Sequence, residues 1–597
     1  MVRPECNEFD WRRSTEGGVV PADGYNPVRL PPGRHGRPNR RDNTVSRESS
    51  GGHETVHMRP TVAIASSADM ALGALAAPLD STLTTEQVRA VVWHALDLDQ
   101  SARNLRAIVR PGAWVVIKPN IVTSRSNRQS AYWHEGREHK GQNTDLRVVK
   151  ALVEYLIART QPRRITIAEG GAEWAKLGEA DTDPAATEDG WTVRWPEYDG
   201  LSYSDLIADW AKSRPGLVDV VDLNYSERRF LPVPDPGGTG IGALQRRGAK
   251  TRPADRYGRD SYIARTGELR PGYDVPVAVL DCDVFISVPA IKTHLISATS
   301  LAIKNYVGIS APLGQAGRMR NSKGDLHRGD IVRGFVDMLA YRPADYSVIE
   351  GFWGTEGNGP QWGDDVQHNI VLASADPVAA DTIGSLIMGY NPEDLTYLRL
   401  AATKRLGEMR PELIEVVGRP WREVARPYPL GRGRSGNAYA GRGVRDWLVE
   451  FHGADGLRRA EFASEDRFVD LTLLSESSGA STACCYSEVD CDAPTDVEAW
   501  FGSEGPGQVL VNGDLIATAG VTDGHHLGEA RARVRLRSDR NRLEVRTERT
   551  GDAFGFTLLL CGQPGCLPIG CHYVGVDVLL ERAIAAGDPV SVSTASR

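Results

Sequence analysis

The sequence predicts an α/β protein with a mostly parallel sheet flanked by helices, followed by a C-terminal antiparallel β-sandwich. Three observations lead to this prediction: short apolar runs that end in charged residues, amphipathic segments between them, and a late change to alternating residues. Fully apolar runs of this length are typical of strands buried on both faces. The stretches that run from such an apolar strand into charged residues lie at 114–120, 165–171, 284–294 and 347–351.

Amphipathic segments separate the apolar runs. Apolar residues recur at helical spacing between 85 and 108, and a second helix is expected just after Asp145. Further along, Asp376 before Pro377 fits a helix N-cap with proline at the first helical position. Asp381, more than a turn inside that helix, is either a solvated flank or a site group. Helices alternating with buried strands indicate a parallel sheet.

The length of 597 residues exceeds what one hydrophobic core usually supports, so several domains are expected. Residues 1–57 are rich in Arg, Gly, Pro, Ser and Asn, which predicts a disordered extension. The α/β domain is expected at 58–430, with an irregular or partly β insertion at about 172–275. A linker at 431–455 leads to the sandwich at 456–597, where alternating runs and an Asn-Gly turn indicate antiparallel hairpins.

Composition excludes some functional classes. Charged residues make up 25% of the chain and the formal net charge is -8, so no basic surface for nucleic acid is expected. No run of about 18 apolar residues occurs, which predicts no membrane span. Without a convincing export signal, a cytoplasmic location is the expectation.

Six of the eight cysteines lie in the last fifth of the chain. Cys561, Cys566 and Cys571 are each separated by four residues, and no C-x2-C pair typical of zinc or ferredoxin sites occurs. Structural thiols or local disulfides are the favoured interpretation. Metal binding and redox chemistry remain alternatives, and an oxidising location would favour disulfides.

Charged side chains follow each apolar run at the point where the predicted strand ends. Ligands of open α/β sheets collect beyond the carboxyl ends of parallel strands. We therefore expect Lys118, Glu169, Lys292, His294 and Glu350 to meet at one edge of the sheet.

The residue types at this edge predict an anion site with acid-base groups. Clustered ammonium groups repel one another unless carboxylates or an anionic ligand offset them. His294, Glu169 and Glu350 are the candidate catalytic residues, and His294 could alternatively bind a divalent metal with either glutamate, or be structural. The candidate ligand-holding residues are Lys118, Asn120, Lys292, Lys304, Asn305, Gly357, Asn358 and Gly359. The alternatives are a structural ion network and, for the glycines, an ordinary turn.

Residues from about 58 to 420 resemble the family known as domain of unknown function 362. The matching motifs are Lys118-Pro-Asn120, Thr144-Asp145, Glu169-Gly170, Val288 to His294, Lys304-Asn305, Glu350-Gly351, Glu356 to Pro360 and Ala373 to Asp381. This resemblance implies no particular reaction. Some members carry ferredoxin-type cysteines, but this chain lacks that motif, so no cluster is implied. The C-terminal part weakly resembles galactose-binding-like sandwiches.

These observations favour an enzyme of unassigned reaction that binds a small anionic metabolite, with lysines holding the anion and His294 or a glutamate moving a proton. One alternative is a non-enzymatic or accessory protein whose sandwich binds a glycan or a partner. Another is a redox or iron–sulfur-associated protein that uses the C-terminal cysteines. Substrate, cofactor and oligomeric state do not follow from the sequence.

Overall fold

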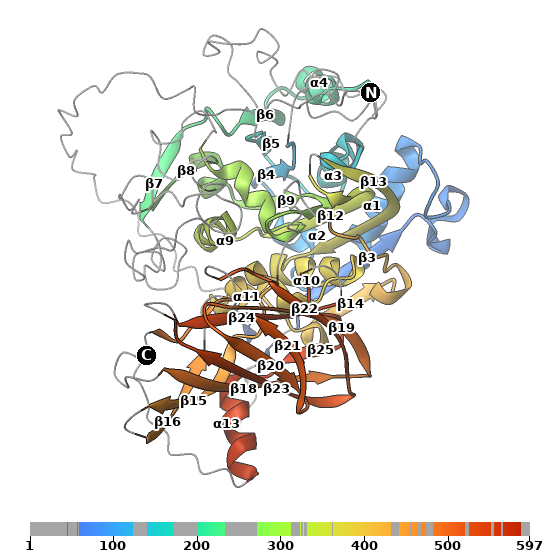
Figure 1. Ribbon diagram of the computed structural model, residues 1–597. Helices are drawn as coiled ribbons and strands as arrows, with labels where there is room; N and C mark the ends of the chain where they lie inside the picture. The colour runs from blue at the N-terminus through green and yellow to red at the C-terminus, as the bar shows by residue number, and fades with distance from the viewer. Residues whose placement is uncertain are drawn as a thin grey trace, which may run out of the picture. The chain divides into compact units, whose positions relative to one another are not determined.

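A computed structural model of the chain describes residues 44–45, 56–57, 59–122, 140–171, 200–232, 272–311, 323, 326, 331–360, 362–431, 441–453, 456–463, 467–472, 481–519, 525–550, 554–562 and 565–586 (Figure 1). Residues 1–58 form a unit separate from residues 59–597. In the first unit only the short ladder of β1 (Thr44–Val45) and β2 (Val56–His57) is described. The prediction of disorder at 1–57 otherwise lies outside the described residues.

A mixed sheet forms the α/β part, with neighbouring strands in the order β14-β3-β13-β12-β9-β4-β5-β6. Strands β12, β9, β4, β5 and β6 run parallel, while β13 is antiparallel to both of its neighbours and β10 adds alongside β12 with β11 beyond it. The bounds are β3 (Thr61–Ser66), β4 (Trp114–Pro119), β5 (Arg164–Glu169), β6 (Val218–Asp222), β9 (Val284–Val288), β10 (Ala290–His294), β11 (Ala298–Ser300), β12 (Tyr346–Asn358), β13 (Trp362–Ser374) and β14 (Glu415–Gly418). The predicted α/β fold class is confirmed.

Helices cover both faces of this sheet, because its strands are apolar on both sides (Figure 1). Along β4, Val115 and Ile117 pack into one core with α1, α3 and α4, whereas Val116 packs into the opposite core with α7, α9, α10 and α11. The bounds are α1 (Thr85–Leu98), α2 (Leu105–Ile108), α3 (Leu146–Arg159), α4 (Tyr203–Ser213), α7 (Val277–Asp281), α9 (Ile331–Tyr341), α10 (Pro377–Ile387) and α11 (Thr396–Thr403). The helices predicted near residue 85 and after Asp145 are confirmed.

Polar residues begin these helices as the sequence predicts. The Asp376 carboxylate accepts hydrogen bonds from the backbone of Val378 (2.8 Å) and Ala379 (3.0 Å), and Pro377 follows it at the start of α10. These bonds satisfy backbone N–H groups that have no partner inside the helix. The N-cap prediction for Asp376 is therefore confirmed.

Replacing Asp376 by alanine is expected to lower the free energy of unfolding by about 1–2 kcal/mol, since the first turn of α10 loses its acceptor. Denaturant-induced unfolding measures this loss. The matched control is Asp364→Ala, because Asp364 is exposed and that change is expected to cost less than about 0.5 kcal/mol. Equal effects of the two changes would contradict the assigned cap.

The region predicted as an irregular insertion contains more regular structure than expected. Residues 172–199 and 233–271 lie outside the description, but α4 and β6 occupy the stretch between them. Strand β6 extends the parallel sheet beside β5, and β7 (Arg228–Pro232) pairs with β8 (Gly272–Pro276). The α/β alternation thus continues one unit further than the sequence pattern indicated.

The C-terminal part is a sandwich of two antiparallel sheets, as predicted. One sheet has the order β16-β15-β18-β23-β20-β21 with β25 beside β18, and the other has the order β17-β24-β19-β22. The bounds are β15 (Asp446–Gly453), β16 (Gly456–Ala463), β17 (Val469–Asp470), β18 (Thr482–Cys491), β19 (Thr495–Ser503), β20 (Gly507–Val511), β21 (Asp514–Ala519), β22 (Ala530–Leu536), β23 (Asp539–Glu548), β24 (Gly555–Cys561) and β25 (Cys571–Tyr573), with α13 (Val576–Ala585) after them.

Alternating residues build the core of the sandwich. Trp447 lies against Phe556 of the facing sheet, with ring centroids 5.0 Å apart. Since β15 begins at Asp446, the first strand lies inside the stretch predicted as a linker. Asn512 and Gly513 have φ values of 54° and 92° at the turn between β20 and β21, which is the conformation that a tight hairpin requires.

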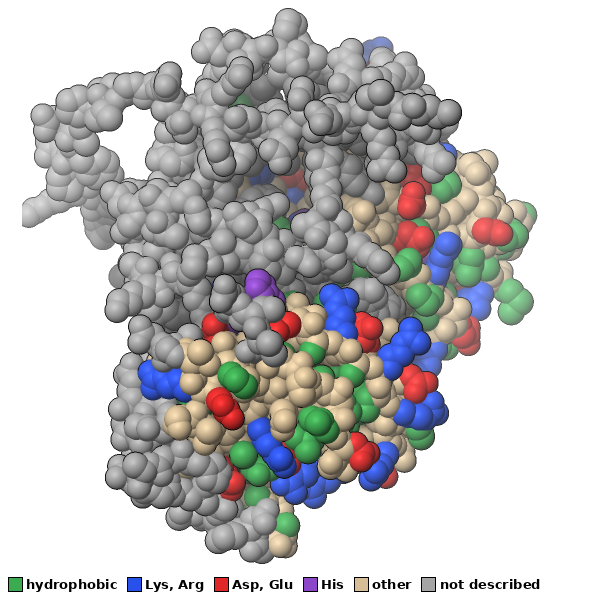
Figure 2. Space-filling view, viewed as in Figure 1, with side chains coloured by type: hydrophobic (Ala, Val, Ile, Leu, Met, Phe, Trp, Pro, Cys, Tyr) green, Lys and Arg blue, Asp and Glu red, His purple; other side chains and the backbone are tan. Residues whose placement is uncertain are grey.

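The arginines of the sandwich face outward. Along β22 the alternate positions are exposed and carry Arg531, Arg533 and Arg535. Figure 2 shows basic side chains interspersed with acidic ones over this part of the molecule. In the parts of the chain that are described, no helix has the length and apolarity needed to cross a membrane.

Candidate functional site

Lys118 and Glu169 form a buried ion pair at the carboxyl ends of two adjacent strands. Because β4 and β5 run parallel and pair in register from Trp114 to Ile117, their last side chains reach the same edge of the sheet. The Lys118 ammonium lies 2.9 Å from each carboxylate oxygen of Glu169 and 2.8 Å from Oδ1 of Asn305. Both charged side chains are almost fully shielded from solvent.

Backbone donors hold the Glu169 carboxylate in place. The N–H groups of Gly170 (2.7 Å) and Ile121 (3.0 Å) donate to its two oxygens, so that each oxygen accepts from the backbone and from Lys118. Gly308 lies directly against this pair, and a Cβ added there would be 2.2 Å from Glu169 Oε1. Burial lowers the pKa of Lys118, while the neighbouring Glu169 opposes that shift.

Lys304 begins the 3₁₀ helix at residues 304–309 and lies next to Lys118. Its ammonium makes no hydrogen bond or ion pair with any described residue, and 9% of the residue's surface remains exposed to solvent. Burial, with a further contribution from Lys118, lowers the pKa of Lys304 to about 7. Asn305 beside it donates to the Lys118 carbonyl (3.0 Å) and to Ser287 Oγ (3.1 Å), which ties this turn to β4 and β9.

A buried carboxylate behind this turn fixes its position. Asp381 of α10 accepts hydrogen bonds from the backbone N–H groups of Ala302 (2.7 Å) and Ile303 (3.0 Å), immediately before Lys304. Asp381 is completely buried. It is therefore neither a solvated flank nor a group of the site edge itself, but the support of the Lys304 turn.

Lys292 approaches from β10. Its ammonium donates to the Gln142 carbonyl (2.6 Å) and to the Asn120 side chain, both neutral acceptors. Burial lowers the pKa of Lys292 to about 7, and the nearby Glu350 opposes this shift. Asn120 is itself fixed by Thr144, whose hydroxyl accepts from the Asn120 N–H at 2.8 Å.

Glu350 lies on β12, beside β10. Its oxygens accept from the backbone N–H groups of Asp145 and Phe352, each at 3.1 Å. Burial raises the pKa of Glu350 to about 8, with a smaller contribution from the Asp145 carboxylate. Glu350 and Lys292 thus have pKa values displaced toward each other, near neutrality, which is a common property of acid-base pairs in enzymes.

Lys118, Glu169, Lys292, Lys304 and Glu350 are called the strand-end cluster below. Two further residues belong to this cluster, although the sequence did not single them out. Lys323 donates to Asn224 Oδ1 (2.9 Å) and to the Ser310 carbonyl (2.7 Å), and its pKa is lowered by burial and by nearby Arg228. Burial raises the pKa of the Tyr203 hydroxyl on α4, with further contributions from Glu169, Asp145 and Glu350. No short motif marks either residue, because each enters the cluster from a segment without a buried strand run.

His294 lies at the outer end of β10, and the turn that contains Gly357, Asn358 and Gly359 lies beside it. His294 is two residues beyond Lys292 and therefore on the same face of the strand, and its Nδ1 accepts from the Ile296 N–H at 3.0 Å. Thr293 points to the opposite face and donates to the Gly357 carbonyl (3.1 Å). The Gly357 N–H donates to the Pro429 carbonyl (2.8 Å).

Gly357, Asn358 and Gly359 thus lie at the end of the β12–β13 hairpin, packed against the Thr293 side of β10. A Cβ at Gly359 would lie 2.3 Å from the Thr293 carbonyl oxygen, so close backbone packing accounts for that glycine. Ligand binding by these three residues stays a prediction. Among the described residues, no group of three or more His, Cys, Asp or Glu side chains is arranged as a metal site.

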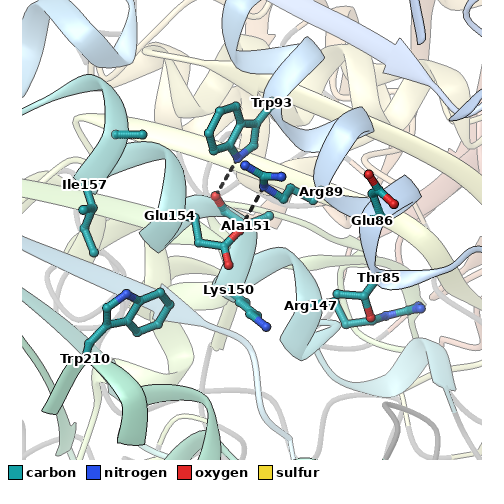
Figure 3. Close-up of a pocket in the computed structure, with 11 residues that line it drawn as sticks. Thr85, Glu86, Arg89, Trp93, Arg147, Lys150, Ala151, Glu154, Ile157 and Trp210 are labelled. Atoms are coloured by element: carbon teal, nitrogen blue, oxygen red, sulfur yellow. Dashed lines mark hydrogen bonds and ion pairs between the residues drawn. The ribbon is translucent and has the colours of Figure 1, made fainter. Parts of the chain in front are cut away.

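A surface hollow of about 630 Å³ lies between α1, α3 and α4 (Figure 3). Trp93 and Trp210 lie on different sides of it. Charged residues line the space between them, and Arg89 and Glu154 form an ion pair at 3.1 Å. The Trp93 ring is covered by the Arg89 guanidinium at 4.4 Å. Since none of the predicted site residues lines this hollow, the strand-end cluster remains the candidate site.

Part of the chain matches a family of known sequences. Residues 239–385 match the family described as Domain of unknown function (DUF362). The DUF362 match contains Lys292, His294, Lys304 and Glu350, and it begins after Lys118 and Glu169. The family resemblance seen in the sequence is confirmed over this narrower range.

A curated relative matches a similarly limited stretch. The thylakoid-associated protein sll1697 of Synechocystis sp. is 31% identical over 133 residues, which are 21% of this chain and 39% of that protein. The matched stretch thus covers well under half of the relative's length.

Solved structures resemble the chain only locally. A β-glucosidase from Kluyveromyces marxianus has a TM-score of 0.17 and 11% identity, covering 24% of this chain and 18% of that chain. A GH2 β-galacturonidase from Eisenbergiella tayi has a TM-score of 0.15 and 16% identity, covering 19% and 23%. These TM-scores are too low to support a conclusion about fold or function, so the galactose-binding-like resemblance stays a prediction.

Proposed function

We propose that the chain is an enzyme that binds a small anionic metabolite at the carboxyl ends of the parallel strands of the sheet. The observation behind this proposal is Lys304, whose side chain is mostly buried and whose solvent-accessible ammonium makes no hydrogen bond or ion pair with any described residue. A charge that has lost most of its contact with water and has no partner is unfavourable, so such groups are usually paired or neutral. A bound anion would supply the missing partner.

The charge balance of the cluster supports the same conclusion. Four of the described lysines are buried, and all four belong to this cluster: Lys118, Lys292, Lys304 and Lys323. Lys118 is paired with Glu169, whereas the raised pKa of Glu350, about 8, keeps that carboxyl protonated near neutrality, so that it does not offset a lysine charge there. Two like charges 4 Å apart repel by about 4 kcal/mol at an effective dielectric constant of 20. An anion would relieve this repulsion.

The chemistry proposed for the bound anion is proton transfer. Glu350 holds its proton up to about pH 8, and Lys292 releases its proton at about pH 7, so one can donate and the other can accept near neutrality. His294 lies on the Lys292 face of β10 and is the third group proposed to move a proton. Lys118 and Glu169 would hold the site together beneath the ligand, since their charges are already paired.

The affinity for an anion is expected to fall as pH rises through about 7. Below that pH Lys304 is an ammonium and attracts the ligand, whereas above it the neutral amine does not, so affinity should drop by up to about tenfold per pH unit. Sulfate is a suitable probe because its charge stays constant on both sides of the Lys304 pKa of about 7. Calorimetric titration across this range measures the dependence.

Two substitutions and a control distinguish the effect of the Lys304 charge on sulfate affinity from an effect of the protein's net charge. Lys304→Met is expected to abolish sulfate binding, while Lys304→Arg should retain binding above pH 7, because a guanidinium stays charged. Lys212→Met, on the exposed side of α4, should change nothing. Sulfate binding that is equally tight in the Lys304→Met protein would refute the proposed function.

A further inference from the structure

We propose that Cys491 and Cys571 form a disulfide that fastens β25 to the sandwich. The two residues are direct partners in the antiparallel pairing of β18 with β25. Their sulfur atoms are 2.7 Å apart and both side chains are buried. Non-bonded sulfur atoms do not ordinarily pack this closely. No other pair of cysteines in the described parts of the chain makes a thiol–thiol contact.

The position of the pair in the ladder is suited to a cross-strand bond. The N–H of Asp492 donates to the Gly570 carbonyl (2.8 Å), and the N–H of Val574 donates to the Glu488 carbonyl (3.3 Å). These bonds mark alternate residue pairs as hydrogen-bonded, so Cys491 and Cys571 form a non-hydrogen-bonded pair between them. Cα atoms in such pairs are roughly 4.5 Å apart, within the range of roughly 4.4–6.8 Å seen in disulfides.

The other described cysteines lack this arrangement. Cys484 and Cys485 are neighbours on β18, so their side chains point to opposite faces of the sheet. Cys282 lies in the α/β part, where its Sγ contacts the Val279 carbonyl at 3.4 Å. Cys561 and Cys566 interact electrostatically but make no thiol–thiol contact. Among the described cysteines the proposed bond is therefore specific to one pair, and Cys282 provides a matched control.

The bond forms by exchange with an external disulfide, such as oxidised glutathione or a protein disulfide. A thiolate of one cysteine attacks that disulfide and gives a mixed disulfide, and the second cysteine then displaces the bound half. Both cysteines lose their protons and together lose two electrons, while the external disulfide leaves as two thiols. Strand β25 pairs over only three residues, so local opening gives the reagent access to the buried sulfur atoms.

The bond would secure the strand by which the sandwich contacts the α/β part. Next to Cys571, His572 Nδ1 lies 2.7 Å from Glu393 Oε1, and the Tyr573 hydroxyl donates to Asp394 Oδ1 at 3.0 Å. Asn391 donates to the Cys571 carbonyl at 2.7 Å. Reduction would therefore loosen the attachment of residues 391–394. Since the cytoplasm keeps thiols reduced, a stable bond would also indicate an oxidising location.

Peptide mapping of the full chain tests the proposal. The protein is incubated with oxidised glutathione, denatured without reductant, alkylated and digested. We expect a cross-linked peptide that contains Cys491 and Cys571 and disappears after reduction, while Cys282 is alkylated. Reduction should lower the Tm of the sandwich transition by roughly 5–15 °C.

Substitutions give a second, independent readout. Cys571→Ser should remove both the cross-link and the dependence of Tm on reductant, whereas Cys282→Ser should retain both. Complete alkylation of Cys491 and Cys571 in the oxidised protein would refute the disulfide. A cross-link of either residue to another cysteine, or only between two chains, would refute it equally. The mapping uses the unmodified protein, so it decides the question even if Cys571→Ser fails to fold.

Discussion

Replacing Lys118 by methionine is expected to lower the free energy of unfolding by about 3–5 kcal/mol, among the largest effects of any single change in this protein. The substitution leaves the Glu169 carboxylate buried without the ammonium that now lies 2.9 Å from both of its oxygens. Asn305 Oδ1 loses its donor as well. Denaturant-induced unfolding at neutral pH measures the cost.

The double variant Lys118→Met with Glu169→Gln is the matched control. Removing both charges eliminates the uncompensated carboxylate, so the double variant should be more stable than Lys118→Met alone. Together with Glu169→Gln alone, these variants complete a double-mutant cycle that isolates the interaction between the two side chains. A Lys118→Met protein that loses less than about 1 kcal/mol would show that the pair is not buried as described.

The strands that carry this pair could be predicted because their physical signal is local. A strand buried on both faces must be apolar at every position, and the run from Val115 to Ile117 shows this without reference to any partner. A charged residue at the end of such a run has a defined place, the carboxyl end of a parallel strand. Lys118 and Glu169 were therefore predicted to meet, and they do.

The remaining members of the cluster could not be predicted in the same way. Tyr203 begins a helix with a capping box at Ser202, but the polar sequence around it gave no sign that the helix would pack beside the strand ends. Gln142 contributes its backbone carbonyl to Lys292, and any residue carries that group. Contacts of this kind depend on tertiary packing and leave no pattern in side-chain type.

Strands, too, could be predicted only where the local sequence carried a clear signal. Strand β6 carries aspartates at Asp219 and Asp222, so it lacks the continuous apolar run that identified β4 and β5. As an edge strand it is only partly buried, which makes these residues acceptable there. Strand β15 was missed for a different reason, because the glycine-rich stretch before it resembles a linker that continues past Asp446.

Replacing Asp381 by alanine is expected to cost about 2–5 kcal/mol and to abolish anion binding at the same time. Two buried N–H groups, of Ala302 and Ile303, would lose their acceptor, and each such loss costs about 1–3 kcal/mol. The turn that these groups fix leads directly into Lys304. Unfolding experiments measure the first effect, and sulfate titration measures the second.

Asp376→Ala is the control that shows whether the loss of sulfate binding is specific to Asp381. Asp376 lies five residues earlier at the start of the same helix, and its carboxylate accepts from the backbone of Val378, Ala379 and Glu408, which lie outside the Lys304 turn. Asp376→Ala should therefore reduce stability by about 1–2 kcal/mol but leave sulfate affinity unchanged. Asp381→Asn keeps the shape of the side chain but turns a donor toward one of the two N–H groups, so its effects should be intermediate. If all three variants bound sulfate like the unmodified protein, the position of Lys304 would not depend on Asp381.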